Sequence, residues 1–351
     1  MWYDRFLKNL TTDIGIDLGT STTLICVKGQ GIVLAEPSIV AINQKTGRVV
    51  AVGNDASGMI GRTPAHIQAI KPLENGVISN FEVGEEMIAY FLRKALSLVS
   101  KSYFRPRVVV SVPSDITNVE RRAVRDAVTN AGAREVHIVE SSMAGAIGVN
   151  MSIFDPVGNM VIDIGGGTTD IAVISLGGVV CSKNLHIAGE KYNQDIINYI
   201  RDEFKILLGE KTAEEVKVSI GAVVKQNTPG EALIRGRDLV TGLPREVAVT
   251  DSDIREAVFN SVNLFVDSVK EVLESTPPEV VSDIMRRGII LIGGGSKVKG
   301  LTELLEKELE IPIYLAEDPE TAVVRGTGVI LNDFEKYRDI LIDNEDDLPP
   351  R

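Results

Sequence analysis

Two stretches of the chain share one pattern of hydrophobic and polar positions, and this pattern predicts two β-hairpins. Residues 161–164 and 171–174 are apolar apart from Asp163, and they flank a glycine-threonine turn. Apolar runs rich in β-branched residues are typical of buried strands. The same order of strand, Asp, Gly-Thr turn and strand recurs at residues 14–25, where Asp17 ends the first strand. The chain therefore contains two related hairpins far apart in sequence.

The two turns have the composition of an anion-binding site. Glycines let a ligand approach the backbone closely, and consecutive turn amides form a concave site for anions. Asp17 and Asp163 each direct a carboxylate at such a turn. A third glycine turn follows the apolar run 289–292 and leads into a helix-like segment. We expect an α/β protein that binds a nucleotide between two related halves.

The rest of the chain reads as alternating strands and amphipathic helices. Strands are predicted at 13–18, 22–28, 31–35, 38–43 and 48–52, and a small β segment at 226–250. A strand at 136–139 ends at Glu140, before a helix of small residues at 141–149. Thr212 is predicted to cap a helix at 213–224, with Glu215 at the capping-box position. Further helices are predicted at 54–60, 82–100, 118–132, 192–204, 252–275, 280–287, 299–309 and 321–331.

Composition limits the function classes. The 351 residues carry a net charge of −12, which argues against nucleic acid as a main partner because duplex binding needs a basic face. Cys26 and Cys181 have neither metal-ligand nor redox spacing, so we expect reduced core thiols. No apolar run reaches the length of a membrane span and no signal peptide is visible, which predicts an intracellular protein.

Two short segments are candidates for contact with a lipid surface. If residues 1–10 are helical, Trp2, Phe6 and Leu7 fall in one apolar arc, as expected of an interfacial anchor. The alternatives are a segment that packs on its own domain or a disordered one. Tyr103 and Phe104 lie in a cationic loop that would be a second membrane contact or, equally, a buried corner. The acidic residues 343–351 are predicted to be disordered.

Several common catalytic patterns are absent from the sequence. No P-loop and no dinucleotide-binding glycine motif occurs, and Ser141-Ser142 lacks a nucleophile elbow. The three histidines, His66, His137 and His186, are scattered, and we expect all of them to be structural. What remains is phosphate chemistry, in which glycine and threonine turns hold a polyphosphate while carboxylates hold a metal ion.

The residues themselves suggest specific roles in that chemistry. Asp17 and Asp163 can hold a hydrated Mg²⁺, which usually keeps several waters and takes one or two carboxylates. Glu140 and Thr168 are candidates for orienting an attacking water. The alternative role of Glu140 is that of an acid that stabilises the dipole of the following helix. Glu214 and Lys217 share a helix face and can hold ribose hydroxyls, or they form an ordinary surface pair.

The motifs resemble one known superfamily. Asp17-Leu-Gly-Thr-Ser-Thr-Thr-Leu and Asp163-Ile-Gly-Gly-Gly-Thr-Thr are similar to the two phosphate motifs of the actin, heat-shock chaperone and sugar-kinase ATPases. Within this superfamily the chain resembles the MreB family of bacterial actins over residues 12 to 333. The stretches that carry this closer likeness are Gly29-Gln-Gly-Ile-Val-Leu-Ala-Glu-Pro-Ser38, Thr241-Gly-Leu-Pro-Arg245, Thr276-Pro-Pro-Glu279 and Leu291-Ile-Gly-Gly-Gly295.

The resemblance implies an actin-like fold of two related lobes, in four subdomains, around a nucleotide cleft. The lobes would be residues 12–149 with 331–342, including a small subdomain at about 36–78, and residues 150–330, including one at about 188–264. ATP and Mg²⁺ would be bound in the cleft. The implied nucleotide-binding residues are Thr20, Ser21, Thr22, Gly165, Gly166, Gly167, Thr168, Glu214, Glu215, Val216, Lys217, Gly294, Gly295, Ser296 and Lys297.

The resemblance also implies a cellular role. A slow ATPase coupled to assembly would form paired protofilaments of this chain at the inner face of the cell membrane. Partners in the membrane-bound elongation machinery would link the filaments to wall synthesis and rod shape. Alternatives are a divergent paralogue, a chaperone-like switch or a small-molecule kinase. A chaperone would need a substrate domain after residue 335, and a kinase a further catalytic Asp, for which we find no candidate.

The chain departs from the family pattern at four places. Glu140-Ser141-Ser142-Met143-Ala144 replaces Glu-Glu-Pro-Met-Ala, and Gly189-Glu190-Lys191-Tyr192-Asn193-Gln194 replaces Gly-Asp-x-Met-Asp-Glu. Ser296-Lys297 replaces Ala-Leu, and Asp170 replaces the common Glu. The first two departures surround the expected nucleotide, so they bear on hydrolysis rate and base preference rather than on binding itself.

Overall fold

The computed structural model describes residues 12–99 and 105–342, and these form two compact units. Among the described residues, unit 1 comprises 12–99, 105–156, 174–179 and 320–342, and unit 2 comprises 157–173 and 180–319. The segments for which we predict membrane contact (Trp2, Phe6, Leu7, Tyr103 and Phe104) and the acidic tail lie outside the described residues. The lobe boundaries proposed above stay a prediction.

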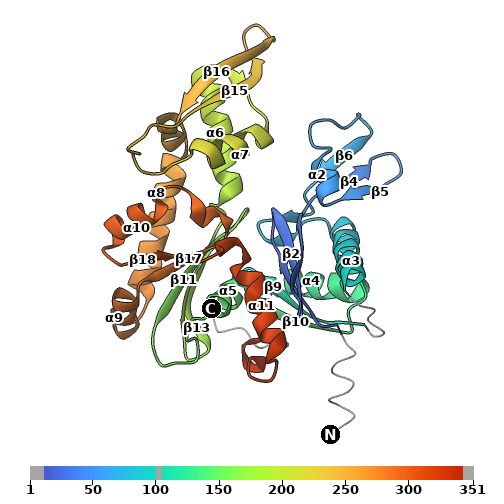
Figure 1. The fold of residues 1–351 in the computed structure, drawn as a ribbon, viewed down its shortest axis with the longest axis vertical. Coiled ribbons are helices and arrows are strands. Elements are labelled where there is room, and N and C mark those ends of the chain that lie inside the picture. Colours follow the sequence, from blue (N-terminus) through green and yellow to red (C-terminus); the bar gives the residue numbers. More distant parts are fainter. Residues whose placement is uncertain (1–11, 100–104, 343–351) are drawn as a thin grey trace. The chain divides into compact units, whose positions relative to one another are not determined.

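Unit 1 is built on a five-stranded sheet with the order β10-β9-β1-β2-β3 (Figure 1). Its strands are β1 (Ile14–Leu18), β2 (Thr22–Val27), β3 (Gly31–Pro37), β9 (Arg107–Val112) and β10 (Glu135–Glu140). β1 pairs antiparallel with β2 and parallel with β9, and β9 pairs parallel with β10. The first predicted hairpin is therefore confirmed, and its inner strand lies at the centre of the sheet.

Helices cover this sheet because their apolar faces match its buried strands. Helix α3 (Phe81–Leu98) contacts α4 (Asn118–Asn130), and both contribute to one core with β1 and β9. Helix α4 begins at a complete capping box made by Thr117 and Glu120. Unit 1 also contains a three-stranded sheet of β4 (Val40–Asn43), β5 (Val49–Val52) and β6 (Ile67–Ile70), with the order β5-β4-β6. The short helix α2 (Asn54–Ser57) follows β5, and β7 (Leu73–Glu74) pairs with β8 (Val77–Ile78).

Two further helices of unit 1 pack through glycines. Helix α5 (Ser141–Gly148) follows β10 directly, and α11 (Ala322–Asn332) crosses it closely. A Cβ atom on Gly148 would lie 1.9 Å from the carbonyl oxygen of Ala322, and one on Gly326 would lie 1.7 Å from that of Ala144. Both distances are far below van der Waals contact, so this backbone approach needs glycine. The 3-10 turn η3 (Arg338–Ile340) follows α11.

Unit 2 is built on a second five-stranded sheet, with the order β13-β12-β11-β17-β18. Its strands are β11 (Asn159–Ile164), β12 (Thr169–Ser175), β13 (Gly178–Leu185), β17 (Ile289–Ile292) and β18 (Ile313–Leu315). β11 and β12 are neighbours, and nearly all their residues are buried. The second predicted hairpin is confirmed. Its core also includes Phe265 and Val269 of the long helix α8 (Asp251–Ser275), and Ile284 of α9 (Pro278–Arg287).

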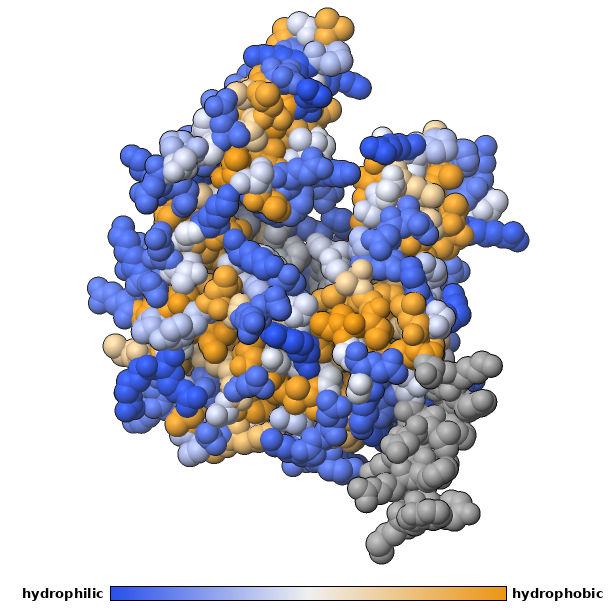
Figure 2. Space-filling model, in the orientation of Figure 1, coloured by the Kyte–Doolittle hydropathy of each residue, from blue (hydrophilic) through white to orange (hydrophobic). Residues whose placement is uncertain are grey.

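The remaining elements of unit 2 form a smaller layer. Helices α6 (Gly189–Phe204) and α7 (Glu210–Ile220) contact each other and share a core with the sheet β14-β15-β16 (Figure 1). Its strands are β14 (Ile206–Leu207), β15 (Glu231–Asp238) and β16 (Pro244–Thr250). Between β15 and β16, Leu239, Val240 and Leu243 are exposed, and Figure 2 shows apolar atoms at the tip of this hairpin. The 3-10 turns η1 (Gly294–Lys297) and η2 (Pro319–Thr321) and helix α10 (Leu301–Leu309) complete the unit.

Two predicted helices start three residues earlier than expected: α6 begins at Gly189 instead of residue 192, and α7 begins before residue 213. Helix α7 begins at Glu210, with Gly209 in the N-cap position, and Thr212 lies inside its first turn. The chain can enter the helix earlier because Glu210 places an acid in the first turn, where the helix dipole favours it. Helix α8, by contrast, starts at a capping box of Thr250 and Asp253, one turn before its first core residue, Ile254.

Candidate functional site

The first glycine-threonine turn, residues 19–21, is held by side chains from distant parts of unit 1. The Oγ atom of Ser38 donates a hydrogen bond to the carbonyl oxygen of Gly19 at 2.6 Å, and the backbone amide of Gly76 donates to Oγ1 of Thr20 at 2.8 Å. Thr20 is buried, whereas Ser21 is half-buried and Thr22 is exposed. Of the three predicted phosphate contacts in this turn, Ser21 and Thr22 are the ones that a ligand can reach from solvent.

Asp17 lies in the strand that enters this turn. The Oγ atom of Ser111 donates a hydrogen bond to its Oδ1 at 3.0 Å. Burial raises the pKa of Asp17 to about 6, against which the bond from Ser111 acts more weakly. A nearby cation favours the charged form of a carboxylate. A half-buried, weakly solvated carboxylate beside a phosphate turn therefore fits the donor chemistry of a hydrated Mg²⁺.

An ion pair with one buried partner joins β3 to helix α3 in unit 1. Glu36 is 4% exposed, and it forms an ion pair with Lys94 of α3 at 2.5 Å. Its Oε2 atom also accepts a hydrogen bond from the backbone amide of Asn54 at 3.2 Å. Gly53 has a φ of 66°, and a Cβ there would collide with the Glu36 carboxylate. Sequence reasoning missed this contact, because the partners are far apart in the chain.

Glu140 occupies the junction of β10 and α5. It is half-buried, pairs in register with Val112 of β9, and is the N-cap residue of α5. Its side chain makes no capping hydrogen bond to the helix. The neighbouring Ser141 donates from Oγ to the carbonyl oxygen of Val112 at 3.0 Å. The position of Glu140 is compatible with both predicted roles, because an acid at a helix N-terminus interacts with the dipole without a direct bond.

The second turn, residues 165–168, is closed by its own backbone and by helix α6. The amide of Gly165 donates to the carbonyl oxygen of Thr168 at 2.9 Å. From α6, the amides of Gly189 and Glu190 donate to the carbonyl oxygens of Gly165 and Gly166, at 3.2 and 2.8 Å. Gly167 is buried, and the other three residues of the turn are half-buried. The N-terminus of α6 thus holds two carbonyl oxygens of this predicted phosphate turn in place.

The third glycine turn packs directly on the second. Gly293 has a φ of 80°, and a Cβ there would lie 2.4 Å from Oδ1 of Asp163. The Oγ atom of the buried Ser296 donates to the carbonyl oxygen of Gly293 at 2.6 Å. Gly294 has open space around it and Lys297 is exposed. Within unit 2 the structure therefore brings Asp163 and the turn 293–297 together.

The predicted adenosine contacts on α7 differ in their accessibility. Lys217 donates from Nζ to Oε2 of Glu214 at 2.8 Å and to the carbonyl oxygen of Gly189 at 2.9 Å. Glu214 and Glu215 are exposed. Val216 is 5% exposed and packs in the apolar core of this layer, so any contact that it makes would use its backbone. The glutamate and lysine pair thus contacts the start of α6.

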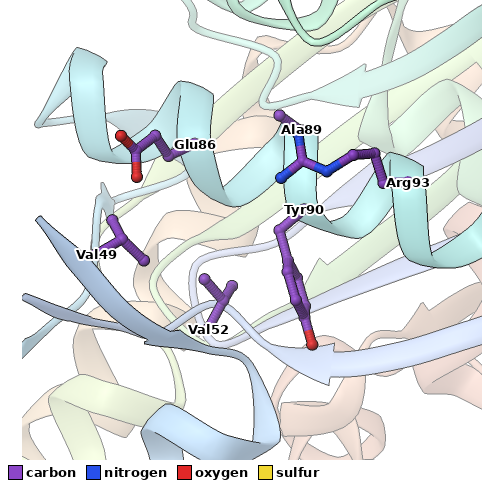
Figure 3. A pocket seen from close by; sticks show the side chains of 6 residues that line it. All are labelled: Val49, Val52, Glu86, Ala89, Tyr90 and Arg93. Atoms are coloured by element: carbon purple, nitrogen blue, oxygen red, sulfur yellow. The ribbon is translucent and has the colours of Figure 1, made fainter.

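A separate hollow of about 330 Å³ lies in unit 1 between α3 and β5 (Figure 3). Figure 3 shows the Glu86 and Arg93 side chains on the helix and Val49 and Val52 on the strand side. Ala89 and Tyr90 complete the lining, and none of the predicted site residues belongs to it. Within residues 12–99 and 105–342, no helix combines the length and the hydrophobicity of a membrane span.

Comparison with known proteins agrees with the motifs. The family model described as MreB/Mbl protein matches residues 11–339. The cell shape-determining protein Mbl of Bacillus subtilis is 48% identical over 92% of this chain and 97% of its own length. The cell shape-determining protein MreB of Escherichia coli is 45% identical over 97% of this chain and 99% of its own length.

Solved structures show the same fold. The crystal structure of MreB5 of Spiroplasma citri bound to ADP has a TM-score of 0.89 and 36% identity, and covers 94% of this chain and 98% of that one. The same protein bound to AMPPNP gives a TM-score of 0.88 and 37% identity, with the same coverage. A MamK double helical filament, at 21% identity, has a TM-score of 0.78, covers 91% of this chain and 98% of that one, and supports the fold alone. The actin-like α/β fold predicted from the motifs is therefore confirmed, and the chain belongs to the MreB/Mbl family of actin-like, cell shape-determining proteins.

Proposed function

We propose that this chain is an ATP-binding and ATP-hydrolysing bacterial actin that assembles into membrane-associated filaments. The observation that carries the proposal is the repeated hairpin, in which Asp17 or Asp163 precedes a glycine-threonine turn. In each unit the turn is fixed by bonds from other elements, so its ligand-facing groups are held in place before binding. The ADP-bound and AMPPNP-bound MreB5 structures support nucleotide binding by this fold.

The proposed site divides its tasks among residues already placed above. Thr20, Ser21, Thr22 and residues 165–168 would hold the phosphates through backbone amides and hydroxyls. Asp17 and Asp163 would hold Mg²⁺ through water, and the ion would neutralise phosphate charge. Residues 214–217 and 294–297 would contact the adenosine. Glu140 and Thr168 would orient the attacking water, which is the step that positioned phosphates still need.

In the cell, filaments of paired protofilaments would lie at the cytoplasmic face of the membrane and organise wall synthesis. Support comes from the cell shape-determining relatives Mbl and MreB. A single short amphipathic helix binds membrane weakly, so residues 1–10 would act in many copies along a filament. Proteins of the cell-elongation machinery in the membrane would be the partners.

The decisive experiment is electron microscopy of the purified full chain with ATP on lipid monolayers, beside a variant lacking residues 1–10. We expect membrane-bound paired filaments for the full chain and their loss in the variant. Filaments that stay on the lipid after the deletion would transfer the anchoring role to Tyr103 and Phe104. A chain that binds ATP but forms no filament under any nucleotide would overturn the assembly proposal and leave an ATP-binding switch. Release of ADP only in the presence of a sugar would indicate a kinase.

A further inference from the structure

Asn193 is a buried polar residue beside the proposed adenosine contacts. It lies in the second turn of α6 and is 4% exposed. Its Nδ2 atom donates a hydrogen bond to Oε2 of Glu214 at 2.6 Å. The same carboxylate oxygen accepts the bond from Lys217. The amide of Asn193 therefore fixes the orientation of a carboxylate that would otherwise be an exposed, mobile side chain.

The other end of this amide has no partner. Its Oδ1 atom is buried and accepts no hydrogen bond from the described residues. Leaving a buried acceptor unpaired costs free energy, and folded proteins rarely do so without a reason. Asparagine Oδ1 can only accept, so the missing partner must be a donor. Because Nδ2 and Oδ1 share one amide carbon, that donor would sit within a few ångströms of Glu214.

The same cluster is connected to the second phosphate turn. Lys217 bonds to the carbonyl oxygen of Gly189, and the amide of Gly189 bonds to the carbonyl oxygen of Gly165. Asn193 is thus four residues from the point where α6 contacts the turn. A ligand that places phosphates at residues 165–168 and reaches along the start of α6 would bring its sugar to this cluster.

We propose that Oδ1 of Asn193 accepts a hydrogen bond from a ribose hydroxyl of the bound nucleotide, and that this bond selects ribonucleotides over deoxyribonucleotides. The inference rests on the proposed function, because it needs a nucleotide in the site. A site built to bond a hydroxyl rejects an analogue without it, since its own polar group is then left unpaired. Asn193 is a specificity residue in addition to the glutamate and lysine pair.

The choice of asparagine at this position has an electrostatic reason. A carboxylate in place of the amide would stand 2.6 Å from the carboxylate of Glu214, and like charges so close repel. The amide retains an oxygen, Oδ1, that can accept a bond from a hydroxyl, and its Nδ2 atom donates to Glu214. Lys217 therefore has one carboxylate to neutralise instead of two.

The test measures binding of ATP, 2′-deoxy-ATP and 3′-deoxy-ATP by calorimetry to the full chain, in the presence of Mg²⁺. The variants are Asn193→Ala, Asn193→Asp and, as a matched control, Gln194→Ala, whose exposed side chain is next on the same helix. We expect the original chain and Q194A to bind ATP about tenfold more tightly than one of the deoxy analogues, the factor for one hydrogen bond. In N193A that preference should vanish through weaker ATP binding, whereas N193D, which keeps an acceptor oxygen, should retain it.

A second background separates direct contact from an effect through Glu214. In Glu214→Ala protein, adding N193A should still remove the remaining preference for the ribonucleotide. A preference that is unchanged in N193A, or an N193A effect that disappears in the Glu214→Ala background, would overturn the inference and leave the proposed function standing. Absence of ATP binding by the original chain would instead overturn the proposed function. If N193A does not fold, N193D is made in the Glu214→Ala background, where no neighbouring carboxylate repels the new one; a loss of preference on adding N193D there would overturn the inference.

Discussion

The closest backbone approach in unit 1 gives a prediction that can be quantified. Helices α5 and α11 meet at Gly148 and Gly326, and a Cβ on Gly326 would lie 1.7 Å from the carbonyl oxygen of Ala144. Ordinary Cβ contacts begin above about 3 Å, so a Gly326→Ala substitution must move the helices apart by more than 1 Å. Backbone stands on both sides of the contact, and no side chain can rotate away.

The expected magnitude follows from two opposing terms. Overpacking of this kind costs about 3 kcal/mol, the upper end for inserted methyl groups. Replacing a helical glycine with alanine returns about 1 kcal/mol through helix propensity. The net loss of about 2 kcal/mol corresponds to a fall of about 4–8 °C in the melting temperature of a domain of this size.

The assay is thermal unfolding followed by circular dichroism, with Gly328→Ala as the matched control on the same helix. A Cβ on Gly328 would meet only the side chain of Cys26, at 3.3 Å, so its propensity gain should nearly balance its cost. The difference between the two variants isolates the helix-helix contact. Equal melting temperatures for G326A and G328A would refute the reasoning, because the helices would then separate without cost.

Three further predictions concern the site and its surroundings. Glu140→Ala should reduce ATP hydrolysis by about 100-fold while leaving nucleotide affinity, measured by calorimetry, unchanged; an unchanged rate would favour the purely structural role. Gly293→Ala should destabilise the fold by about 2 kcal/mol, because φ is positive there and the methyl group meets Asp163, whereas Gly294→Ala, in open space, should melt like the original chain. Hydrogen bonds from the backbone amides of Thr241 and Val240, with Arg245, lower the pKa of Asp238 to about 2. Its stabilising effect should therefore be complete above about pH 5 and be lost progressively as the pH falls through the unfolded value of 3.8 and the folded value of about 2. The difference in melting temperature between Asp238→Asn and the original chain at pH 6 should therefore shrink steadily toward pH 2.

The sequence was sufficient to predict the parts of the fold that depend on local pattern. β-Branched runs around glycine turns predict both hairpins, and Asp17 and Asp163 each lie one residue before the end of the strand that enters the turn. The start of α7 was mispredicted because Thr212 carries a good capping signal, whereas the helix dipole favours the acid Glu210 in the first turn of an earlier start.

Contacts between distant residues could not be predicted from pattern. Nothing in the local sequence marks Ser38 as a partner of Gly19, or Lys94 as a partner of Glu36, because such pairs are set by the fold alone. Asn193 offered one signal, its departure from the family's Asp, but that signal gives neither its burial nor its bond to Glu214. The assignment of individual site residues therefore stays a prediction, whereas the fold does not.

The short segment from Glu36 to Ser38 links the first glycine-threonine turn to helix α3 and to the backbone at Asn54, which allows binding events at these places to be coupled. Ser38 donates a hydrogen bond to the carbonyl oxygen of Gly19. Glu36 forms the ion pair with Lys94 and accepts a hydrogen bond from the backbone amide of Asn54. Coupling between two binding events is always reciprocal. Suppose that a ligand on the first turn shifts the β5-β4-β6 sheet and so changes the affinity of that sheet for a second molecule. The second molecule, when bound to the sheet, then changes the affinity of the first turn for its ligand by the same factor. In the proposed filament, binding of a neighbouring subunit to this sheet and binding of nucleotide to the first turn would thus be coupled, so that each changes the affinity of the other.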